Sequence, residues 1–170
     1  INTMKNKKIM TSLVLALILI LQLNNIVFAA SKKNSNEYSA KDVKLLACLI
    51  YTEAGNHSYK GKVAVGDVVL NRIGSSEFSH CKTIKDVIYD NKWAVQFGVT
   101  IGGSKSPLSK ALRNYTELKK QKQMQSCIKA AKAALNGDNT VGKRLYFTRY
   151  SKSLAKKHPN HMKISSHIFY

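Results

Sequence analysis

"SAKDVKLLACLIYTEAG", residues 39–55, is the stretch on which the fold prediction depends. Ser39 with Asp42 three residues later is a capping-box pair that begins a helix, and Gly55 can end that helix. With about 100° of rotation per residue, one line of this helix surface is almost entirely apolar. The residues on that line are Leu46, Leu49, Ile50 and Glu53. We therefore expect Glu53 near the centre of an apolar face.

Glu53 has two alternative roles in such a place. A carboxylate on a packed face loses water, which raises its pKa and lets it donate a proton near neutral pH. Glycoside cleavage needs such a donor for the leaving oxygen. The alternative is a buried ion pair, for which Arg72 in the next helix is the obvious partner. Glu37, Glu77 and Glu117 lack comparable apolar neighbours.

"HSYKGKVAVGDVVLNRIGSS", residues 57–76, predicts a second helix. It is apolar on most sides, so it belongs in a core, and Gly66 permits the close approach of another helix. Its β-branched residues make a buried strand conceivable, but length and the 3.6-residue period favour a helix.

The rest of the chain predicts more helix and a little sheet. "TIKDVIYD" predicts a short helix, and residues 91–109 are typical of a glycine-rich loop. Residues 109–137 predict a helix that ends at Gly137, with an uncertain break near 120–123. "RLYFTRY" and the terminal "SHIFY" are strand-like. The predicted fold class is α+β, mostly helical with a small β element.

The N-terminus has the pattern of a secretory signal, if the first three residues are an artefact before Met4. Three lysines precede the apolar run "IMTSLVLALILILQL", and "VFAAS" supplies small residues for cleavage after Ala29. We expect residues 1–29 to be a signal peptide, 30–40 a linker and 41–170 one domain. The alternative is an uncleaved membrane anchor, but the run is short and polar residues interrupt it.

Beyond residue 29, the chain has 25 basic and 9 acidic side chains, a net charge of +16. Such a surface attracts anionic polymers. Nucleic acid is one candidate, but no recognition motif is present and secretion argues against it. Anionic wall polymer or lipid fits an extracellular protein better, and the lysines could also confer only solubility.

Three cysteines, an odd number, show no C-x-x-C spacing, so neither a disulfide scaffold nor a zinc ribbon is expected. Cys48 and Cys127 lie in apolar helical patterns and should be buried thiols, whereas Cys81 could pair with one of them. The histidine spacings match no metal motif, so we expect neither a metal site nor a cofactor. These histidines are His57, His80, His158, His161 and His167.

"ACLIYTEAGNHSYKGKVAVGDVVLNRI", residues 47–73, resembles the signature block of the SleB/CwlJ-type cell wall hydrolases, the spore cortex-lytic enzyme family. Weaker matches follow in order, namely "IKDVIY", "QF", "AAKAALNGDN", "LYF" and "HIFY", so the resemblance covers residues 43–170. It implies a lysozyme-like, lytic-transglycosylase fold and identifies residues 41–170 as a cell wall hydrolase catalytic domain. Glu53 falls on the position of the family's catalytic glutamate.

The expected substrate-binding residues are Asn71, Arg72, Trp93, Gln96, Phe97 and Tyr146. Asn71, Arg72, Gln96 and Phe97 fall on recurrent motif positions of the family. Trp93 and Phe97 lie in the glycine-rich loop and could stack on sugars, whereas Gln96 could bind an N-acetyl group or only brace the loop. The chain departs from the family at "QFGV", where the family has "QFS", and at Asp67, where a small residue is usual.

The resemblance implies a secreted, wall- or spore-associated lytic transglycosylase that cleaves the MurNAc–GlcNAc β-1,4 bond of peptidoglycan. With a single acid, the substrate's own muramyl 6-hydroxyl can act as nucleophile and give a 1,6-anhydro product. Hydrolysis stays open, because Asp67 or another acid could approach in the fold. Vegetative wall and spore cortex both remain candidate substrates.

A non-catalytic wall-binding or regulatory protein with the same fold is the alternative. No segment of the printed sequence resembles the peptidoglycan-binding repeat that some members carry. We therefore expect the basic surface or an accessory protein to anchor the substrate, and no stable membrane span after cleavage of the signal.

Overall fold

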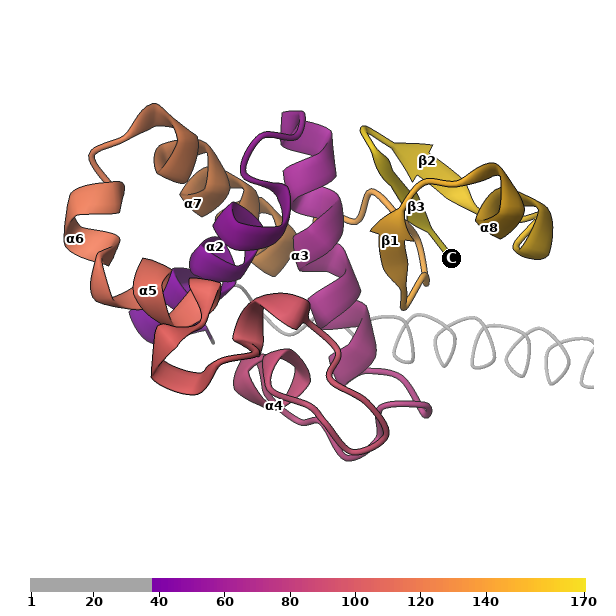
Figure 1. Ribbon diagram of the computed structural model, residues 1–170, viewed down its shortest axis with the longest axis horizontal. Helices are drawn as coiled ribbons and strands as arrows, with labels where there is room; N and C mark the ends of the chain where they lie inside the picture. Colours follow the sequence, from indigo (N-terminus) through magenta and orange to yellow (C-terminus); the bar gives the residue numbers. More distant parts are fainter. Residues whose placement is uncertain (1–37) are drawn as a thin grey trace, which may run out of the picture. The chain divides into compact units, whose positions relative to one another are not determined.

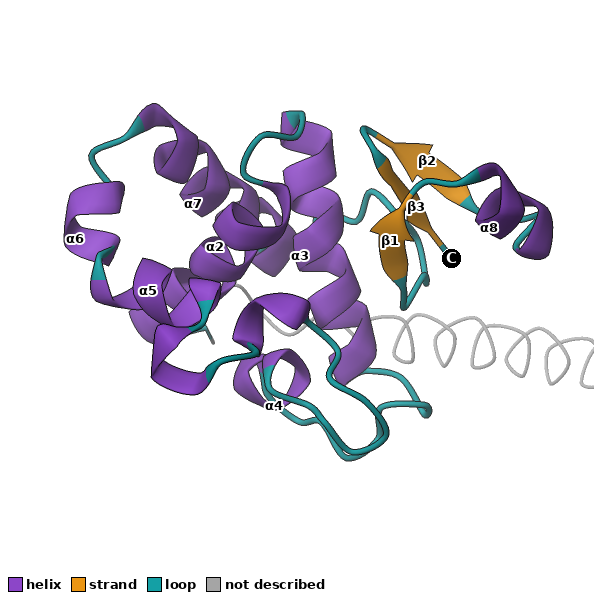
Figure 2. Cartoon of the chain, in the orientation of Figure 1, coloured by secondary structure: helices purple, strands orange, loops and turns teal. Residues whose placement is uncertain are grey.

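The computed structural model describes residues 38–170 (Figures 1 and 2). The predicted signal peptide and nearly all of the predicted linker lie outside these residues. None of the described helices is long and apolar enough to cross a membrane. In chain order the elements are α2 (Ala40–Ala54), α3 (Tyr59–Ile73), α4 (Ile84–Ile88), the 3₁₀ turns η2 (Gly98–Thr100) and η3 (Gly103–Lys105), α5 (Pro107–Arg113), α6 (Tyr115–Leu118), α7 (Lys122–Leu135), β1 (Phe147–Arg149), α8 (Lys152–Lys157), β2 (Met162–Ile164) and β3 (His167–Phe169).

Helix α2 begins with the predicted capping box. The Asp42 amide donates to Ser39 Oγ at 3.2 Å, and the Ser39 amide donates to the Asp42 carboxylate at 2.9 Å. Gly55 follows the last helical residue but keeps right-handed backbone angles, φ −53° and ψ −35°. A Cβ there would lie 2.5 Å from the Tyr51 carbonyl oxygen and 3.0 Å from Gln123 Nε2. Close packing, not a left-handed turn, therefore requires glycine at this position.

Helix α3 is buried on two sides, as its composition predicts. Val63, Val65 and Val69 belong to the main core, which α2 and α7 complete. Ala64 and Val68 face a second, smaller cluster that includes core residues of the sheet. In Figure 1, α3 stands between the helical group and the three strands. It is therefore the element that joins the two parts of the core.

Gly66 lies where α3 packs against α7. A Cβ at Gly66 would lie 3.0 Å from the Ala134 Cβ and 3.4 Å from Ile50 Cδ1. We expect Gly66→Val to destabilise the fold by about 1–3 kcal/mol, because the added methyl groups overpack this crossing. Gly98→Val is the control, since a Cβ at Gly98 meets nothing within 4 Å. Urea unfolding measures both, and equal midpoints for the two variants would contradict the prediction.

The sheet is antiparallel, with strand order β1-β3-β2. Phe147 pairs with Phe169 across β1 and β3, and Met162 pairs with Phe169 across β2 and β3. The strands in "RLYFTRY" and "SHIFY" are confirmed. The sequence prediction lacked β2 and α8, because "MKI" and "KSLAKK" are too short to show a period.

Residues 107–135 form three helices, where one helix with an uncertain break was predicted. Pro107 begins α5 at a position where its missing amide costs nothing. Asn114 then separates α5 from α6, and a turn precedes α7. Gly137 ends this region as predicted: it has φ +95°, and the amides of Gly137 and Asp138 bond to the Ala134 and Ala133 carbonyls, a Schellman motif.

All three cysteines are buried and free, so the pairing left open for Cys81 does not occur. Burial raises the pKa of the Cys48 and Cys127 thiols to about 11. Both are therefore inert packing residues in the core, as predicted.

Asp67 ties α3 to the segment that leads into the sheet. Its Oδ2 accepts hydrogen bonds from the Thr140 amide at 2.6 Å and the Thr140 hydroxyl at 2.8 Å. Asn71, one turn further along α3, bonds not to Asp67 but to Gly142, Arg144 and Asn139 among the described residues. Burial, partly offset by Thr140, raises the pKa of Asp67 from 3.8 to about 6.

This raised pKa predicts a pH-dependent stability. Between pH 3.8 and about 6 the folded chain holds a proton at Asp67 that the unfolded chain has lost. The stability associated with Asp67 is therefore fully present below pH 3.8 and falls by roughly 2–3 kcal/mol as the pH rises through about 6. We expect Asp67→Asn, which can still accept from the Thr140 amide, to lack this loss.

Chemical unfolding of Asp67→Asn and wild type at pH 4 and pH 7 measures the difference. The variant should gain stability relative to wild type on going to the higher pH. A difference that stays constant between the two pH values would show that Asp67 is not the titrating group.

Candidate active site

The last turn of α2 places Glu53 on the line of Leu46, Leu49 and Ile50, which are all fully buried. The Glu53 side chain itself is half-buried. Burial raises the pKa of its carboxyl above the ordinary value. Among residues 38–170, no hydrogen bond or ion pair to this carboxylate is found. It is thus a desolvated acid that is still reachable from solvent.

Glu53 opens onto a pocket of about 520 Å³. Three helices contribute to it, since α2 packs against both α5 and α7. The Gln123 side-chain amide donates to Asn56 Oδ1 at 2.6 Å and closes one wall. The pocket is lined by Tyr51, Thr52, Glu53, Ala54, Gly55, Asn56, His57, Pro107 and Gln123. Among these residues Glu53 is the only acid.

His57 borders the same pocket and lies against the sheet. Its Nε2 lies 3.0 Å from the Ser166 hydroxyl, and its ring centroid is 4.4 Å from that of His167. Burial, followed by the charge of Lys62, lowers the pKa of His57. Burial also lowers the pKa of His167 to about 4. Both shifts favour the neutral form of the imidazole ring.

Arg72 is not the partner of Glu53. Its Nε donates to the Leu145 carbonyl at 2.8 Å, and the side chain is only 3% exposed. The guanidinium carbon lies 4.6 Å from the ring centre of Phe78, 5.2 Å from that of Phe97 and 5.3 Å from that of Tyr146. Arg72 thus binds the loop before the sheet to an aromatic cluster, and the ion-pair alternative for Glu53 is excluded.

Asn71 also holds the segment before β1. Its side-chain amide donates to the Gly142 carbonyl at 2.7 Å and to the Arg144 carbonyl at 2.9 Å. Its Oδ1 accepts from Asn139 at 3.3 Å. The "NR" pair at the end of α3 therefore fixes residues 139–145, and neither side chain lines the Glu53 pocket.

The three loop residues predicted to bind substrate have different surroundings. Trp93 is 64% exposed and stands edge-on to His80, with ring centroids 5.1 Å apart. Gln96 donates to the Ala94 carbonyl at 3.0 Å, the loop-bracing role that was the alternative. Phe97 is 2% exposed and packs in the main core, so it offers no free ring face to a sugar.

Tyr146 lies at a second pocket, of about 570 Å³. Its hydroxyl donates to the Glu77 carboxylate, and its ring stacks on Tyr170 with centroids 5.7 Å apart. The structure brings Tyr146, Arg72 and Phe97 together, but it places none of them in the lining of the Glu53 pocket. Of the predicted site residues, Glu53 alone lines that pocket.

The other residues that line the Glu53 pocket were not predicted from the sequence. Asn56 and His57 directly follow the glycine that ends α2, so their position beside Glu53 was a usable signal. Pro107 begins α5 and Gln123 lies in the first turn of α7. Both are more than fifty residues from Glu53, and only the packing of these helices on α2 brings them close.

Known proteins resemble this chain in both sequence and structure. The chain is 30% identical over 139 residues to a spore cortex-lytic enzyme of Bacillus cereus, a match that covers 79% of this chain and 46% of that protein. A spore cortex-lytic enzyme of Oceanobacillus iheyensis is 42% identical over 53 residues, 31% of this chain and 18% of that protein. The chain thus spans less than half the length of these curated relatives.

Two solved structures share the fold. The catalytic domain of the germination-specific lytic transglycosylase SleB from Bacillus anthracis matches with a TM-score of 0.53 and 26% identity, over 79% of this chain and 97% of that one. The catalytic domain of the Bacillus cereus SleB protein matches with a TM-score of 0.50 and 27% identity, over 79% and 92%. The predicted mostly helical, lytic-transglycosylase-like fold is therefore confirmed.

A family model for cell wall hydrolases matches residues 56–170, which is most of the described chain. The match begins three residues after Glu53, so it bears on the fold that surrounds this glutamate and not on the residue itself. On this match the chain belongs to the Cell Wall Hydrolase family.

Proposed function

We propose that this chain is a peptidoglycan-degrading glycosidase, with Glu53 as its catalytic acid. The observation that carries the proposal is a half-buried carboxyl, unpaired among the described residues, whose raised pKa suits proton donation and which opens onto a pocket. Membership of the Cell Wall Hydrolase family and the likeness to a solved lytic transglycosylase domain support this substrate class.

The bond cleaved is proposed to be the MurNAc–GlcNAc β-1,4 linkage. Glu53 donates its proton to the glycosidic oxygen as the bond between this oxygen and the anomeric carbon breaks. The muramyl 6-hydroxyl then attacks the anomeric carbon and gives its proton to the Glu53 carboxylate. The product is a 1,6-anhydro end, no water is consumed, and Glu53 returns to its protonated form.

Transglycosylation is favoured over hydrolysis by the composition of the pocket. Enzymes with the usual retaining or inverting mechanisms place a second carboxyl within about 5–9.5 Å of the first. No second acid is found among the residues that line the Glu53 pocket. The acid left open, Asp67, is bound by Thr140 and does not line the Glu53 pocket. The substrate hydroxyl is therefore the better nucleophile.

The other predicted residues receive narrower roles in this proposal. Trp93, with its exposed ring, and Tyr146, at the second pocket, remain proposed sugar contacts. Asn71, Arg72 and Phe97 are proposed to act indirectly, by holding the segments that surround the substrate. Gln96 is proposed to brace the loop that carries Trp93.

We further propose that the protein acts outside the membrane, on wall or spore cortex. The support is the predicted signal in residues 1–29 and a net charge of +16 beyond it, which suits an anionic wall polymer. An accessory protein could add to this anchoring. The same charge also favours the second candidate function, a wall-binding protein without catalysis.

Digestion of purified vegetative peptidoglycan and spore cortex by the purified chain tests the proposal. Mass spectrometry of the released muropeptides should find 1,6-anhydro ends, which are lighter by one water than hydrolysed ends. Reducing ends alone would show hydrolysis. Binding to the wall without soluble muropeptides would overturn the proposed activity and support the wall-binding protein.

A further inference from the structure

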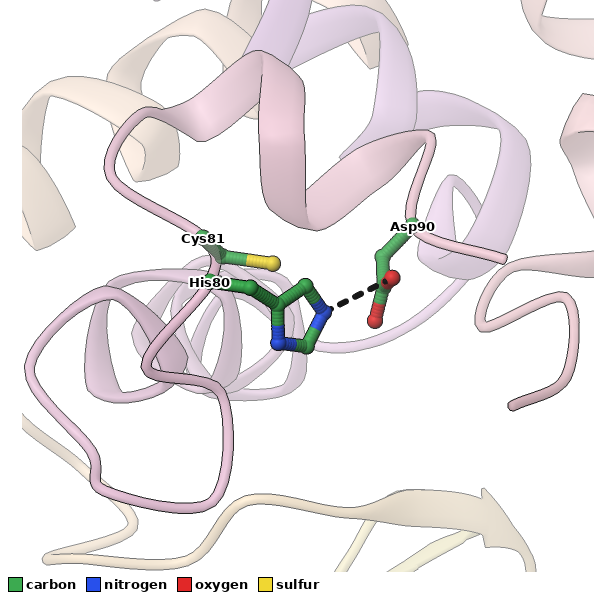
Figure 3. Close-up of side chains that lie close together, drawn as sticks. All are labelled: His80, Cys81 and Asp90. Atoms are coloured by element: carbon green, nitrogen blue, oxygen red, sulfur yellow. Dashed lines mark hydrogen bonds and ion pairs between the residues drawn. The ribbon is translucent and has the colours of Figure 1, made fainter. Parts of the chain in front are cut away.

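His80, Cys81 and Asp90 bring three different metal-ligand types together, away from the Glu53 pocket. One ligand atom from each residue lies within 4.8 Å of the other two. His80 and Cys81 precede α4, and Asp90 follows it (Figure 3). The short helix therefore returns the chain so that residues nine and ten positions apart meet. The spacing of histidines alone could not predict this cluster, since it contains only one.

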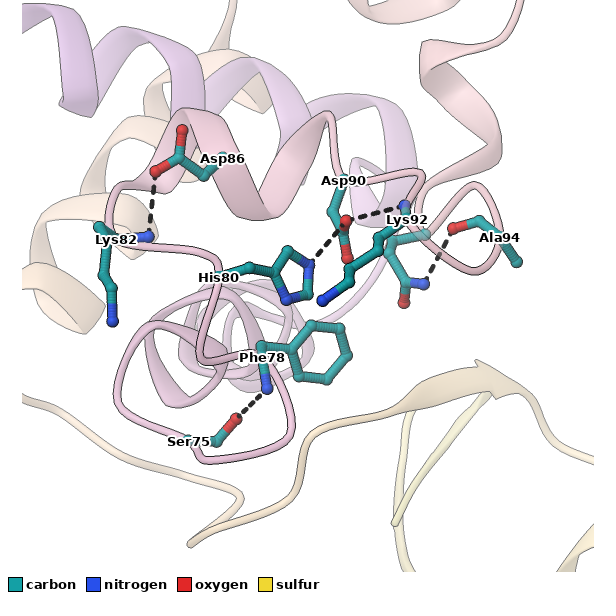
Figure 4. Close-up of polar contacts among 9 residues, drawn as sticks. Ser75, Phe78, His80, Lys82, Asp86, Asp90, Lys92 and Ala94 are labelled. Carbon is teal, nitrogen blue, oxygen red and sulfur yellow. Dashed lines mark hydrogen bonds and ion pairs between the residues drawn. The ribbon is translucent and has the colours of Figure 1, made fainter.

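The cluster is buried and its polar atoms are incompletely satisfied. Asp90 is 7% exposed and Cys81 1%, whereas His80 is partly open to solvent. Asp90 Oδ1 pairs with His80 Nε2 at 2.9 Å and accepts from the Lys92 amide at 3.1 Å (Figure 4). Asp90 Oδ2 and His80 Nδ1 are buried and have no hydrogen-bond partner among residues 38–170. An unpaired buried carboxylate oxygen is costly, so a cation is a natural partner for it.

The three ligand atoms of the cluster restrict the kind of cation that can bind there. One thiol, one imidazole and one carboxylate match the ligands of Zn²⁺ and of similar divalent transition metals. Mg²⁺ and Ca²⁺ prefer oxygen ligands alone. Around a tetrahedral zinc, donor atoms lie roughly 3–4 Å apart, so only a small adjustment of the present positions is needed.

Arg72, Asp86 and Lys82 are charged neighbours that such a site must accommodate. The Arg72 guanidinium interacts electrostatically with both Asp90 and Cys81. The positive charge of Arg72 partly cancels the negative charge of Asp90. A bound divalent ion therefore needs a second negative ligand, the thiolate of Cys81. Because hard cations bind thiolates poorly, this requirement disfavours them further, and the affinity of the site should depend mainly on Cys81.

We propose that His80, Cys81 and Asp90 form a binding site for Zn²⁺ or a similar transition-metal ion, with the fourth position left to water. The ion would join the two ends of α4. It would also fix the start of the following loop, because Asp90 holds the Lys92 amide and Trp93 stands edge-on to His80. The role is structural and independent of the Glu53 chemistry.

The single tryptophan of the chain makes the test specific. Reduced, metal-free full-length protein is titrated with Co²⁺. We expect one equivalent to produce thiolate-to-cobalt charge-transfer absorption and to quench Trp93 fluorescence, and Zn²⁺ to displace the cobalt. Cys81→Ser should abolish the charge-transfer band and weaken binding by more than the roughly 10–100-fold that loss of an outer-shell partner costs.

Cys48→Ala is the matched control, because Cys48 is also a buried free thiol but lies in α2, outside the cluster. It should bind cobalt like wild type. Asp90→Asn should weaken binding while keeping the charge-transfer band, and circular dichroism checks that each variant is folded. No band and no quenching in the folded wild type, or a band that persists in Cys81→Ser, would overturn the proposal.

Discussion

Replacing Glu53 by glutamine is expected to lower the rate of muropeptide release by about 10²–10⁴-fold, the usual contribution of a general acid. Glutamine has nearly the same shape but has no proton to give to the glycosidic oxygen. The measurement is the initial rate of soluble muropeptide release from purified peptidoglycan, with wild type and variant at equal concentrations.

The same substitution should leave the fold intact. The Glu53 carboxylate has no hydrogen bond or ion pair among the described residues that glutamine would break. Its raised pKa means that ionisation costs folding energy, so a neutral amide should be as stable as the acid or slightly more stable at neutral pH. A large loss of activity with an unchanged unfolding midpoint would thus assign the effect to chemistry.

The pH dependence of the wild type offers a second observable for Glu53. The donor must be protonated, so the rate should fall as the pH rises through the raised pKa of this carboxyl. Because burial shifts that pKa upward, activity should persist to higher pH than an ordinary, exposed glutamate would allow. A rate that keeps rising through neutral pH would contradict Glu53 as the donor.

Glu117→Gln is the matched control for Glu53→Gln. Glu117 is exposed on α6 and pairs with Lys120 at 2.8 Å. Loss of such a surface pair costs little, so both activity and stability should equal those of the wild type. If Glu53→Gln released muropeptides as fast as Glu117→Gln, the proposed catalytic role of Glu53 would be wrong.

Local sequence patterns correctly predicted those elements whose apolar and capping residues match their packing in the fold. The Ser39–Asp42 capping box and the apolar line that ends at Glu53 are properties of consecutive residues, and both are confirmed. The same holds for α3, whose apolar residues on most sides fit its place between two core clusters. Such features need no knowledge of distant contacts.

Contacts between residues far apart in the sequence account for what the sequence did not predict. The sequence alone does not select a partner for the Arg72 side chain. Only the folded chain brings the Leu145 carbonyl and three aromatic rings around it. Phe97 lies in a glycine-rich loop, which suggested a surface role, but it closes the main core. Gln123 reaches the Glu53 pocket only because α7 packs on α2. In each case tertiary packing overrides the local pattern.

Arg72→Ala is expected to destabilise the fold by about 3–5 kcal/mol. The truncation leaves the Leu145 carbonyl without its donor, which costs about 1–3 kcal/mol. It also removes cation–π contacts with three rings, each worth about 0.5–2 kcal/mol, and leaves a cavity. Arg72→Lys should not restore the stability, because a compact ammonium group cannot stack between these rings as a planar guanidinium does.

Urea unfolding of Arg72→Ala, Arg72→Lys and the control Arg149→Ala measures this effect. Arg149 is an exposed arginine of β1, so its removal should change the stability by less than about 0.5 kcal/mol. Arg72 lines neither the Glu53 pocket nor the second pocket, so the fraction of Arg72→Ala that remains folded should still release muropeptides. A variant as stable as wild type but inactive would instead place Arg72 in direct contact with the substrate, because the loss would then come from binding or chemistry and not from the aromatic cluster that it holds together.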